Sequence, residues 1–210
     1  MGEKMSFKKE SVFPGICLLI YLVEFVFFAI HPSKMSIWIT ENLIASVTVL
    51  ILFILYRKGI RFSNTSYTLM LIALTCQTIG GHYTFGAVPF DFITELFGFQ
   101  RNNFDRVGHF MVGFFAYPVM EYNEQKKLIK GRFLTAFLVV MGIFGIAGLF
   151  EVAEWLYVEI AAKDVGIAFL GTQDDLWDAQ KDILCDGLGA IFTVALYTIL
   201  NRKNAERSEQ

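Results

Sequence analysis

The chain has 210 residues, of which 55% are hydrophobic and 16% aromatic, and its mean hydropathy is +0.50. This composition is far more apolar than that of a soluble domain, so it argues against a solvated globular protein and favours an integral membrane protein. The formal net charge is −2 and no basic tract is interleaved with aromatic residues, so we expect no nucleic-acid partner. The three widely spaced cysteines predict neither a disulfide framework nor a zinc framework.

In chain order, six apolar stretches approach the roughly 20 residues that a helix needs to cross a hydrocarbon core about 30 Å thick. They cover residues 13–30, 37–56, 67–79, 107–120, 133–158 and 183–200. The first stretch is interrupted by Glu24 and is followed by no A-x-A-like cleavage site, so we predict a retained helix and not a signal peptide. The prediction is an all-α integral membrane protein, a single domain over residues 1–210 built as a bundle of six transmembrane helices.

Basic residues predict the orientation of this bundle. If the N-terminus is cytoplasmic, most of the 18 lysines and arginines fall on the cytoplasmic side, in the termini and in alternate connections. Cytoplasmic loops carry such an excess of lysine and arginine. We therefore predict that both termini are cytoplasmic.

The connection at 80–103, "GGHYTFGAVPFDFITELFGFQRNN", is too long and aromatic for a simple solvated loop. Gly80 and Gly81 predict the end of the third helix. Residues 89–99 predict a short interfacial or re-entrant helix, placed as a lid over polar residues of the bundle. The segment "GIAFLGTQ", at 166–173, is expected to turn back onto the bundle.

Titratable residues gather on the predicted extracytoplasmic half. They are His82, Asp105, Arg106, His109, Glu151, Glu154, Asp174, Asp175, Asp178, Asp182 and Asp186. Spacings of three and four residues place Asp178, Asp182 and Asp186 on one helix face, and pair Asp105 with His109 and Glu151 with Glu154. Clustered carboxylates repel one another and are costly to remove from water, so they require a cation, a shared proton or a water-filled cavity.

These residues divide into candidate roles. Asp105, Arg106, His109, Glu151 and Asp182 are the catalytic candidates, and His82, Glu154, Asp178 and Asp186 the candidates for a substrate or supporting network. If the cofactor is a divalent metal, the candidate ligands are His82, His109, Glu151 and Asp182.

Structural explanations stand beside these roles. Asp174 and Asp175 also suit the positive end of a helix, and Asp178 and Asp182 could simply face an aqueous vestibule. Glu154 could lie among the headgroups beside Trp155. Glu24 could join the site or fill a packing defect, and the sequence does not decide between the two.

Four ordered blocks carry a family resemblance: "GGHYTFGAVP", "RNNFDRVGHFMVGF", "FEVAEW" and "FLGTQDDLWDAQKD". They resemble the signature of the YjdF-type bacterial inner-membrane proteins, a family without an established biochemical function. The resemblance covers about residues 80–190 and implies a multi-pass protein of the bacterial inner membrane.

A weaker similarity is to VanZ-like membrane proteins. Asp105, Arg106 and His109 fit that family's first block, while Glu154 and Asp186 stand where amides are usual and make this site more acidic. The similarity implies an envelope location and a shared site, without naming a reaction.

Three classes of function remain. The first is a membrane-embedded enzyme, metal-assisted and acting on a lipid or lipid-linked envelope substrate, with Arg106 clamping an anionic group and His109 as general acid or base. The second is a small transporter or proton- or cation-coupled carrier, since acids within a membrane also mark such pathways. The third is a structural or regulatory subunit whose polar network only fixes the helices.

Overall fold

The computed structural model describes residues 12–160, 170 and 172–208, and these form helices and no strand. The elements are α1 (Phe13–Phe28), α2 (Met35–Arg57), α3 (Asn64–Tyr83), η1 (Phe85–Ala87), α4 (Asp91–Leu96), α5 (Phe104–Val112), η2 (Gly113–Phe115), α6 (Ala116–Lys126), α7 (Arg132–Ile160) and α9 (Asp178–Ser208). The prediction of an all-α protein is confirmed.

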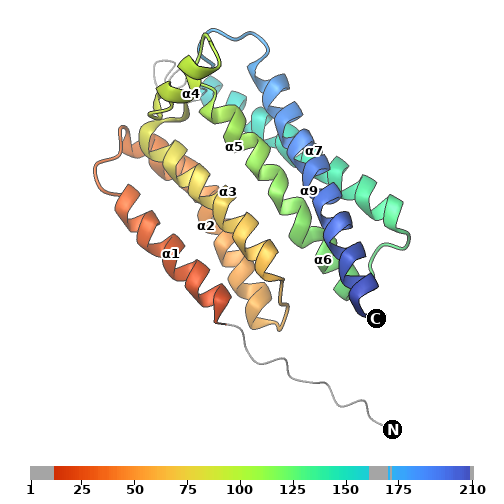
Figure 1. Cartoon of the computed structure of the whole chain (residues 1–210). Coiled ribbons are helices and arrows are strands. Elements are labelled where there is room, and N and C mark those ends of the chain that lie inside the picture. The colour runs from red at the N-terminus through yellow and green to blue at the C-terminus, as the bar shows by residue number, and fades with distance from the viewer. Residues whose placement is uncertain (1–11, 161–169, 171, 209–210) are drawn as a thin grey trace.

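The long helices lie side by side and run between two ends of an elongated bundle (Figure 1). The elements α5, η2 and α6 follow one another without a gap and act as one rod. The first turn of α1 and the last turns of α9 lie at one end of the bundle, and α4 lies at the other (Figure 1). This arrangement brings the start of α5 and the start of α9, which carry most of the candidate residues, to the same end.

Three helices in the described part are long and apolar enough to cross a membrane: Met35–Arg57, Arg132–Ile160 and the segment Asp178–Asn201 of α9. The helix α1 is apolar but shorter. The predicted stretch 67–79 lies within α3, and the stretch 107–120 runs through α5, η2 and α6. Six crossings and the orientation of the ends stay predictions.

Glycines set the closest helix contact in the bundle, where α5 and η2 cross α9. A Cβ atom on Gly113 would overlap the backbone at Gly189 and Ala190, and one on Gly189 would overlap the carbonyl of Phe110. The sequence suggests a different contact strip, the glycines of α7 at 142, 145 and 148, but a Cβ atom on any of these meets nothing within 4 Å. Among the described residues, that strip is therefore not a helix contact.

The connection between α3 and α5 differs from its prediction in two respects. Gly80 and Gly81 do not end α3, which continues to Tyr83 and stops where Thr84 adopts a positive φ of 67°. Their missing side chains leave room for the ring of Phe85 and for Asn42. The helix α4 has no buried residue, and Phe92 in it is 75% exposed, as expected for an interfacial helix but not for a tightly packed lid. The segment 166–173 lies mostly outside the described residues.

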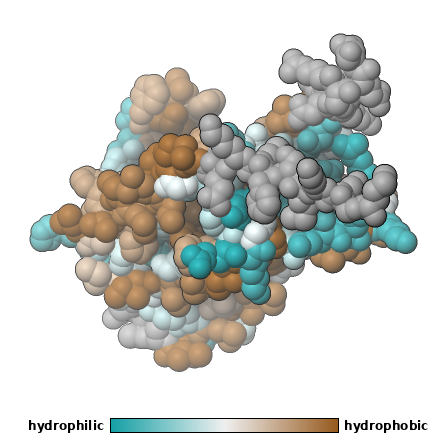
Figure 2. Space-filling model, turned by 90° about the horizontal axis from the view of Figure 1, so that it is seen from below, coloured by the Kyte–Doolittle hydropathy of each residue, from teal (hydrophilic) through white to brown (hydrophobic). Residues whose placement is uncertain are grey.

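The end of the bundle that holds the first turn of α1 also holds the α2–α3 and α6–α7 connections (Figure 1). Seen from this end, hydrophobic residues cover much of the periphery, and hydrophilic residues gather toward the middle and one side (Figure 2). The exposed residues Arg57, Lys58 and Arg61 lie at the end of α2 and in the α2–α3 connection. A belt of apolar side chains between polar ends is the surface expected of a protein solvated by lipid.

Candidate functional site

The helix α9 carries a buried stripe of three aspartates. Asp178, Asp182 and Asp186 are 7%, 2% and 1% exposed, and their four-residue spacing places them on one face. This face packs against α5 and α7. Three carboxylates are therefore held inside the protein and away from lipid, which requires partners of opposite charge.

Two arginines neutralise the outer part of this stripe. The guanidinium groups of Arg101 and Arg106 each donate a hydrogen bond of 2.5 Å to Oδ1 of Asp178. Both also approach Oδ2 of Asp175, at 3.5 and 3.3 Å, and Nη1 of Arg106 contacts Oδ1 of Asp182. The guanidinium of Arg106 is therefore already paired with carboxylates of the protein itself. An anionic substrate, which the sequence predicts Arg106 to clamp, would have to compete with these ion pairs.

The segment before α9 is tied to the segment before α5 by a reciprocal pair of hydrogen bonds. The backbone N–H of Asn102 donates to Oε1 of Gln173 at 3.0 Å, and Nε2 of Gln173 donates to the carbonyl of Asn102 at 2.9 Å. The segments "RNNFDRVGH" and "TQDDLWD", which lie far apart in the sequence, therefore meet at this end of the bundle. This contact fixes the start of α5 against the start of α9.

Asp175 lies outside the candidate membrane spans and has a strongly acidic carboxyl. Its Oδ2 accepts from Nζ of Lys181 at 2.6 Å, and its Oδ1 accepts from the N–H of Trp177 at 3.1 Å. The Lys181 hydrogen bond, followed by the Trp177 N–H, lowers the pKa of Asp175 from 3.8 to about 2. A lowered pKa means that this carboxylate stabilises the fold above its unfolded-state pKa and loses that effect as the pH falls through the folded-state pKa.

We expect Asp175→Asn to lower the midpoint of thermal unfolding in detergent at pH 5–7 by a few degrees. The difference from wild type should shrink between about pH 4 and pH 2, because Asp175 itself becomes protonated there. Unfolding curves of both proteins across this range check the prediction. Lys181→Met removes the main cause of the lowered pKa, so the pH range over which Asp175 loses its stabilising effect should move to higher pH. A difference in unfolding midpoint between wild type and Asp175→Asn that does not change with pH would contradict the stabilising role of the Asp175 carboxylate.

The imidazole of His109 lies at the centre of the buried acids. Its Nδ1 is 2.8 Å from Oδ2 of Asp186, so Nδ1–H donates to that carboxylate. Its Nε2 faces three further carboxylate oxygens: Asp105 Oδ1 at 3.6 Å, Glu151 Oε1 at 3.8 Å and Asp182 Oδ1 at 3.8 Å. These three distances exceed a hydrogen bond. One histidine therefore joins acids from α5, α7 and α9.

This spacing suits a metal ion. Bonds of about 2.0–2.2 Å from zinc to nitrogen and oxygen place two ligand atoms of one tetrahedral ion about 3.4 Å apart. Asp105, His109 and Asp182 each offer a ligand atom, and these atoms lie within 4.8 Å of one another. The side chain of Glu151 is 10% exposed, and its buried Oε1 has no hydrogen-bond partner. A metal-binding histidine commonly donates its second N–H to a carboxylate, as His109 does to Asp186.

The acids form the polar wall of a cavity of about 370 Å³. Glu41, Gln77, Asp105, His109, Glu154, Asp182 and Asp186 make this wall. Within it, Nε2 of Gln77 donates to Oε2 of Glu41 at 2.9 Å. The rest of the lining is mostly apolar and comes mainly from α2, α3, α5, α6 and α7, together with Phe85 of η1. The cavity is therefore amphipathic, as a site for a lipid would be.

The apolar part of the cavity reaches the outer surface of the bundle. Ile44 of α2 and Ile146 of α7 both line the cavity, and they are 48% and 63% exposed. The helices α2 and α7 do not pack closely on each other: α2 packs along α3, and α7 packs along α6 and α9. An opening between them would face the lipid and not the aqueous phase.

Comparison with known proteins places the chain in a family. Residues 13–203 match a family described as predicted membrane proteins, DUF2238. The chain belongs to the DUF2238 family. The inner membrane protein YjdF of Escherichia coli (strain K12) is 37% identical over 130 residues. The aligned region is 61% of this chain and 62% of that relative, less than two thirds of its length. No solved structure matches.

The predicted resemblance to YjdF-type proteins is thereby confirmed, and the DUF2238 chain is a membrane protein. The comparisons do not show the weaker similarity to VanZ-like proteins. They name no reaction or ligand, so the chemistry of the DUF2238 site has to be argued from its own residues.

The structure does not bring every predicted residue of the DUF2238 chain into the site. His82 lies apart from the buried acids: its Nδ1 is 2.8 Å from the carbonyl of Phe28, and its own carbonyl accepts from the N–H of Ser33 at 2.8 Å. The first contact joins α3 to the end of α1, and the second joins it to the α1–α2 connection. Glu24 accepts a hydrogen bond of 2.6 Å from Thr75 and does not line the cavity. Both residues connect helices and are not part of the candidate metal group.

Two residues of the site, Glu41 and Arg101, were not among the site residues predicted from the sequence. Glu41 is 3% exposed and faces the same cavity as His109, although it lies in the second apolar stretch. A carboxylate inside a predicted membrane span was a usable signal, because such residues are costly and rarely face lipid. Arg101 gave no such signal, since it precedes α5 in an ordinary polar segment and becomes important only because α9 begins beside it.

Proposed function

We propose that the chain is a membrane-embedded enzyme that holds a divalent metal ion at Asp105, His109 and Asp182, with Glu151 as a further ligand. Its substrate is a lipid or a lipid-linked envelope precursor whose hydrocarbon chain lies in the amphipathic cavity. The reaction is hydrolysis or group transfer at the polar wall. The observation that carries the proposal is that imidazole Nε2 of His109 faces three carboxylate oxygens. His109 and two of these acids, Asp105 and Asp182, lie in the polar wall of a cavity lined mainly by apolar side chains.

The roles follow from the contacts. A metal ion at Nε2 of His109 would activate a water molecule or polarise an oxygen of the substrate. Asp186 holds the imidazole in one orientation through Nδ1. Glu154 and Glu41 line the same cavity and are the candidate groups for proton exchange in the reaction. Arg101 and Arg106 hold the start of α9 against α5.

The half of the bundle away from the buried acids favours an enzyme over a transporter. Toward the other end of the bundle, α6, α7 and α9 pack around a mainly apolar core of Ala116, Tyr117, Met120, Val139, Ile143, Ala190, Val194 and Tyr197. The buried polar side chains that α7 and α9 add there, Thr135 and Thr193, are hydroxyls and not acids. A carrier of protons or cations needs polar groups along its path. The described residues place their buried acids in one half of the bundle, as a one-sided active site requires.

Access through the α2–α7 opening gives a test. In nanodiscs containing a phospholipid with a photoreactive acyl chain, we expect crosslinks to the cavity-lining parts of α2, α5 and α7. Ile146→Trp should reduce these crosslinks about tenfold, because Ile146 lines the cavity where it meets the surface.

Leu149→Trp is the matched control for this experiment. Leu149 lies on the same helix and is 71% exposed, but does not line the cavity. Crosslinking and turnover of an added lipid mixture, followed by mass spectrometry, should be preserved in this variant. Equal crosslinking in both variants would exclude this entry route, and a lipid mixture left unchanged by the metal-loaded wild type would argue against the enzyme.

A further inference from the structure

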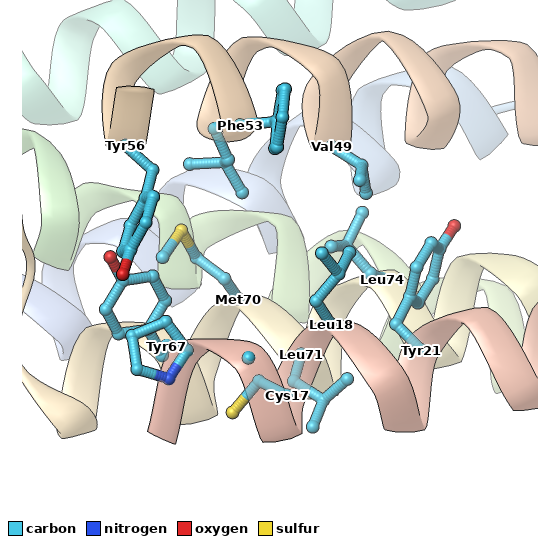
Figure 3. A pocket seen from close by; sticks show the side chains of 13 residues that line it. Cys17, Leu18, Tyr21, Val49, Phe53, Tyr56, Tyr67, Met70, Leu71 and Leu74 are labelled. Carbon is cyan, nitrogen blue, oxygen red and sulfur yellow. The ribbon is translucent and has the colours of Figure 1, made fainter. Parts of the chain in front are cut away.

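A second cavity lies between α1, α2 and α3, on the side of the bundle away from the acids of α9. Its volume is about 200 Å³, and its lining is almost entirely apolar (Figure 3). The helices α1 and α2 each pack along α3 but make little contact with each other, so the space between them is a groove. Leu18 of α1 and Phe53 of α2 line this groove from either side and are partly exposed on the membrane-facing surface.

The dimensions of the groove fit one hydrocarbon chain. On α1 the lining runs from Pro14 to Tyr21, about 10 Å at 1.5 Å per residue. A volume of about 200 Å³ spread over that length makes a narrow groove, the shape that a stretch of one extended hydrocarbon chain requires. A helix from a second protein molecule is about 10 Å across and would not enter.

The groove ends in polar and cationic groups. Tyr56 and Tyr67 lie at one end of it (Figure 3). The guanidinium of Arg61 lies 3.5 Å above the centre of the Tyr56 ring, and Arg57 and Lys58 follow Tyr56 directly. All three cations are exposed, and none of them pairs with a carboxylate of the described residues.

The opposite end of the bundle provides a contrast. There, Arg101, Arg106 and Lys181 are each paired with an aspartate. At the end of the groove, in contrast, Arg57, Lys58 and Arg61 make no ion pair within the described chain, although Arg61 also donates to the backbone carbonyls of Tyr56 and Ile60. Basic pockets between transmembrane helices bind the headgroups of anionic lipids, and each lysine or arginine near a membrane surface contributes to such binding.

We propose that this groove binds one acyl chain of an anionic phospholipid, with the headgroup held by Arg57, Lys58 and Arg61 and the phenols of Tyr56 and Tyr67 at the junction. The site is separate from the proposed metal site and does not depend on it. It would favour a phospholipid from the leaflet that faces the α2–α3 connection.

Native mass spectrometry of the full chain in a neutral detergent tests the proposal, with phosphatidylglycerol as the anionic probe and phosphatidylcholine as the zwitterionic one. We expect one tightly bound phosphatidylglycerol per chain and at least tenfold weaker binding of phosphatidylcholine. The triple variant Arg57→Gln, Lys58→Gln, Arg61→Gln should lose this preference. Lys126→Gln, Lys127→Gln, Lys130→Gln removes the same charge from the other connection at that end and should keep it.

A second experiment, independent of the charge substitutions, blocks the groove itself. Gly15 lines the groove, and a Cβ atom there meets nothing within 4 Å, so Gly15→Phe should fill the space without displacing the backbone. We expect it to weaken phosphatidylglycerol binding about tenfold, while Gly142→Phe, at an equally open position outside the groove, leaves it unchanged. Circular dichroism and gel filtration check that each variant is folded.

Two results would overturn the proposal. Equal loss of lipid binding in the two triple variants would mean general attraction to the basic end of the protein and not a site. Undiminished binding in Gly15→Phe would place the lipid elsewhere. Metal content is expected to stay at the wild-type level in all these variants, so a failure here is distinguishable from a failure of the proposed enzyme.

Discussion

Wild-type protein purified in detergent is expected to bind about one divalent metal ion per chain, and His109→Ala to bind almost none. The physical reason is that Nε2 of His109 faces the oxygens of Asp105, Glu151 and Asp182 at 3.6–3.8 Å, close to the spacing of ligands around one ion. Asp186→Asn should weaken metal affinity about 10- to 100-fold, because Asp186 orients the imidazole without being a ligand in this arrangement. Elemental mass spectrometry and calorimetric titration with Zn²⁺ and Mn²⁺ measure both effects.

His82→Ala is the control for the metal experiment. This histidine bonds to the carbonyl of Phe28 and lies outside the buried group, so its removal should leave metal binding intact. A wild-type protein that binds no metal at saturating concentrations would contradict the metal site. Equal loss in His82→Ala and His109→Ala would show that the loss comes from damage to the fold and not from removal of a ligand.

The largest expected effect on stability comes from Gly189→Leu. A Cβ atom at this position overlaps the carbonyl of Phe110, and the contact is made by backbone, which cannot rotate away as a side chain would. We expect a loss of about 3 kcal/mol or more in the free energy of unfolding, because overpacking at a tight contact forces backbone shifts. Gly113→Leu, on the other side of the same crossing, should have a similar effect. Unfolding in a mixed detergent series, followed by circular dichroism, measures the loss.

Gly142→Ala is the comparison for this prediction. Its Cβ atom meets nothing within 4 Å, and replacing glycine by alanine inside a helix stabilises it by up to about 1 kcal/mol. The two positions together test whether the α5–α9 crossing, and not the glycine strip of α7, is the tight contact. A Gly189→Leu variant as stable as Gly142→Ala would contradict the crossing.

Several polar residues could be placed on the correct helix face from the sequence alone. Asp178, Asp182 and Asp186 could be placed on one face from their spacing, and the structure finds all three buried there. The pairing of Asp105 with His109 followed from the same rule, and their facing atoms lie 3.6 Å apart. Helical periodicity determines which residues share a face, because 3.6 residues complete a turn whatever the surroundings.

The partners of these faces were less predictable. Arg106 was a candidate for binding an anion, but the structure surrounds it with Asp175, Asp178 and Asp182. His82 was a candidate ligand and instead joins α3 to the end of α1 and to the α1–α2 connection. Periodicity gives the direction of a side chain on its own helix, but not which neighbouring helix it meets.

By itself, then, the amino-acid sequence determined that this is a helical membrane protein with its acids gathered at one end, because apolar length and residue spacing are local properties. Tertiary structure decided that Nε2 of His109 faces acids from three helices, that Glu41 shares their cavity and that Gly113 and Gly189 form the tight crossing. These features depend on how helices distant in sequence approach one another. That approach is set by the packing of side chains against backbone, which no single segment encodes.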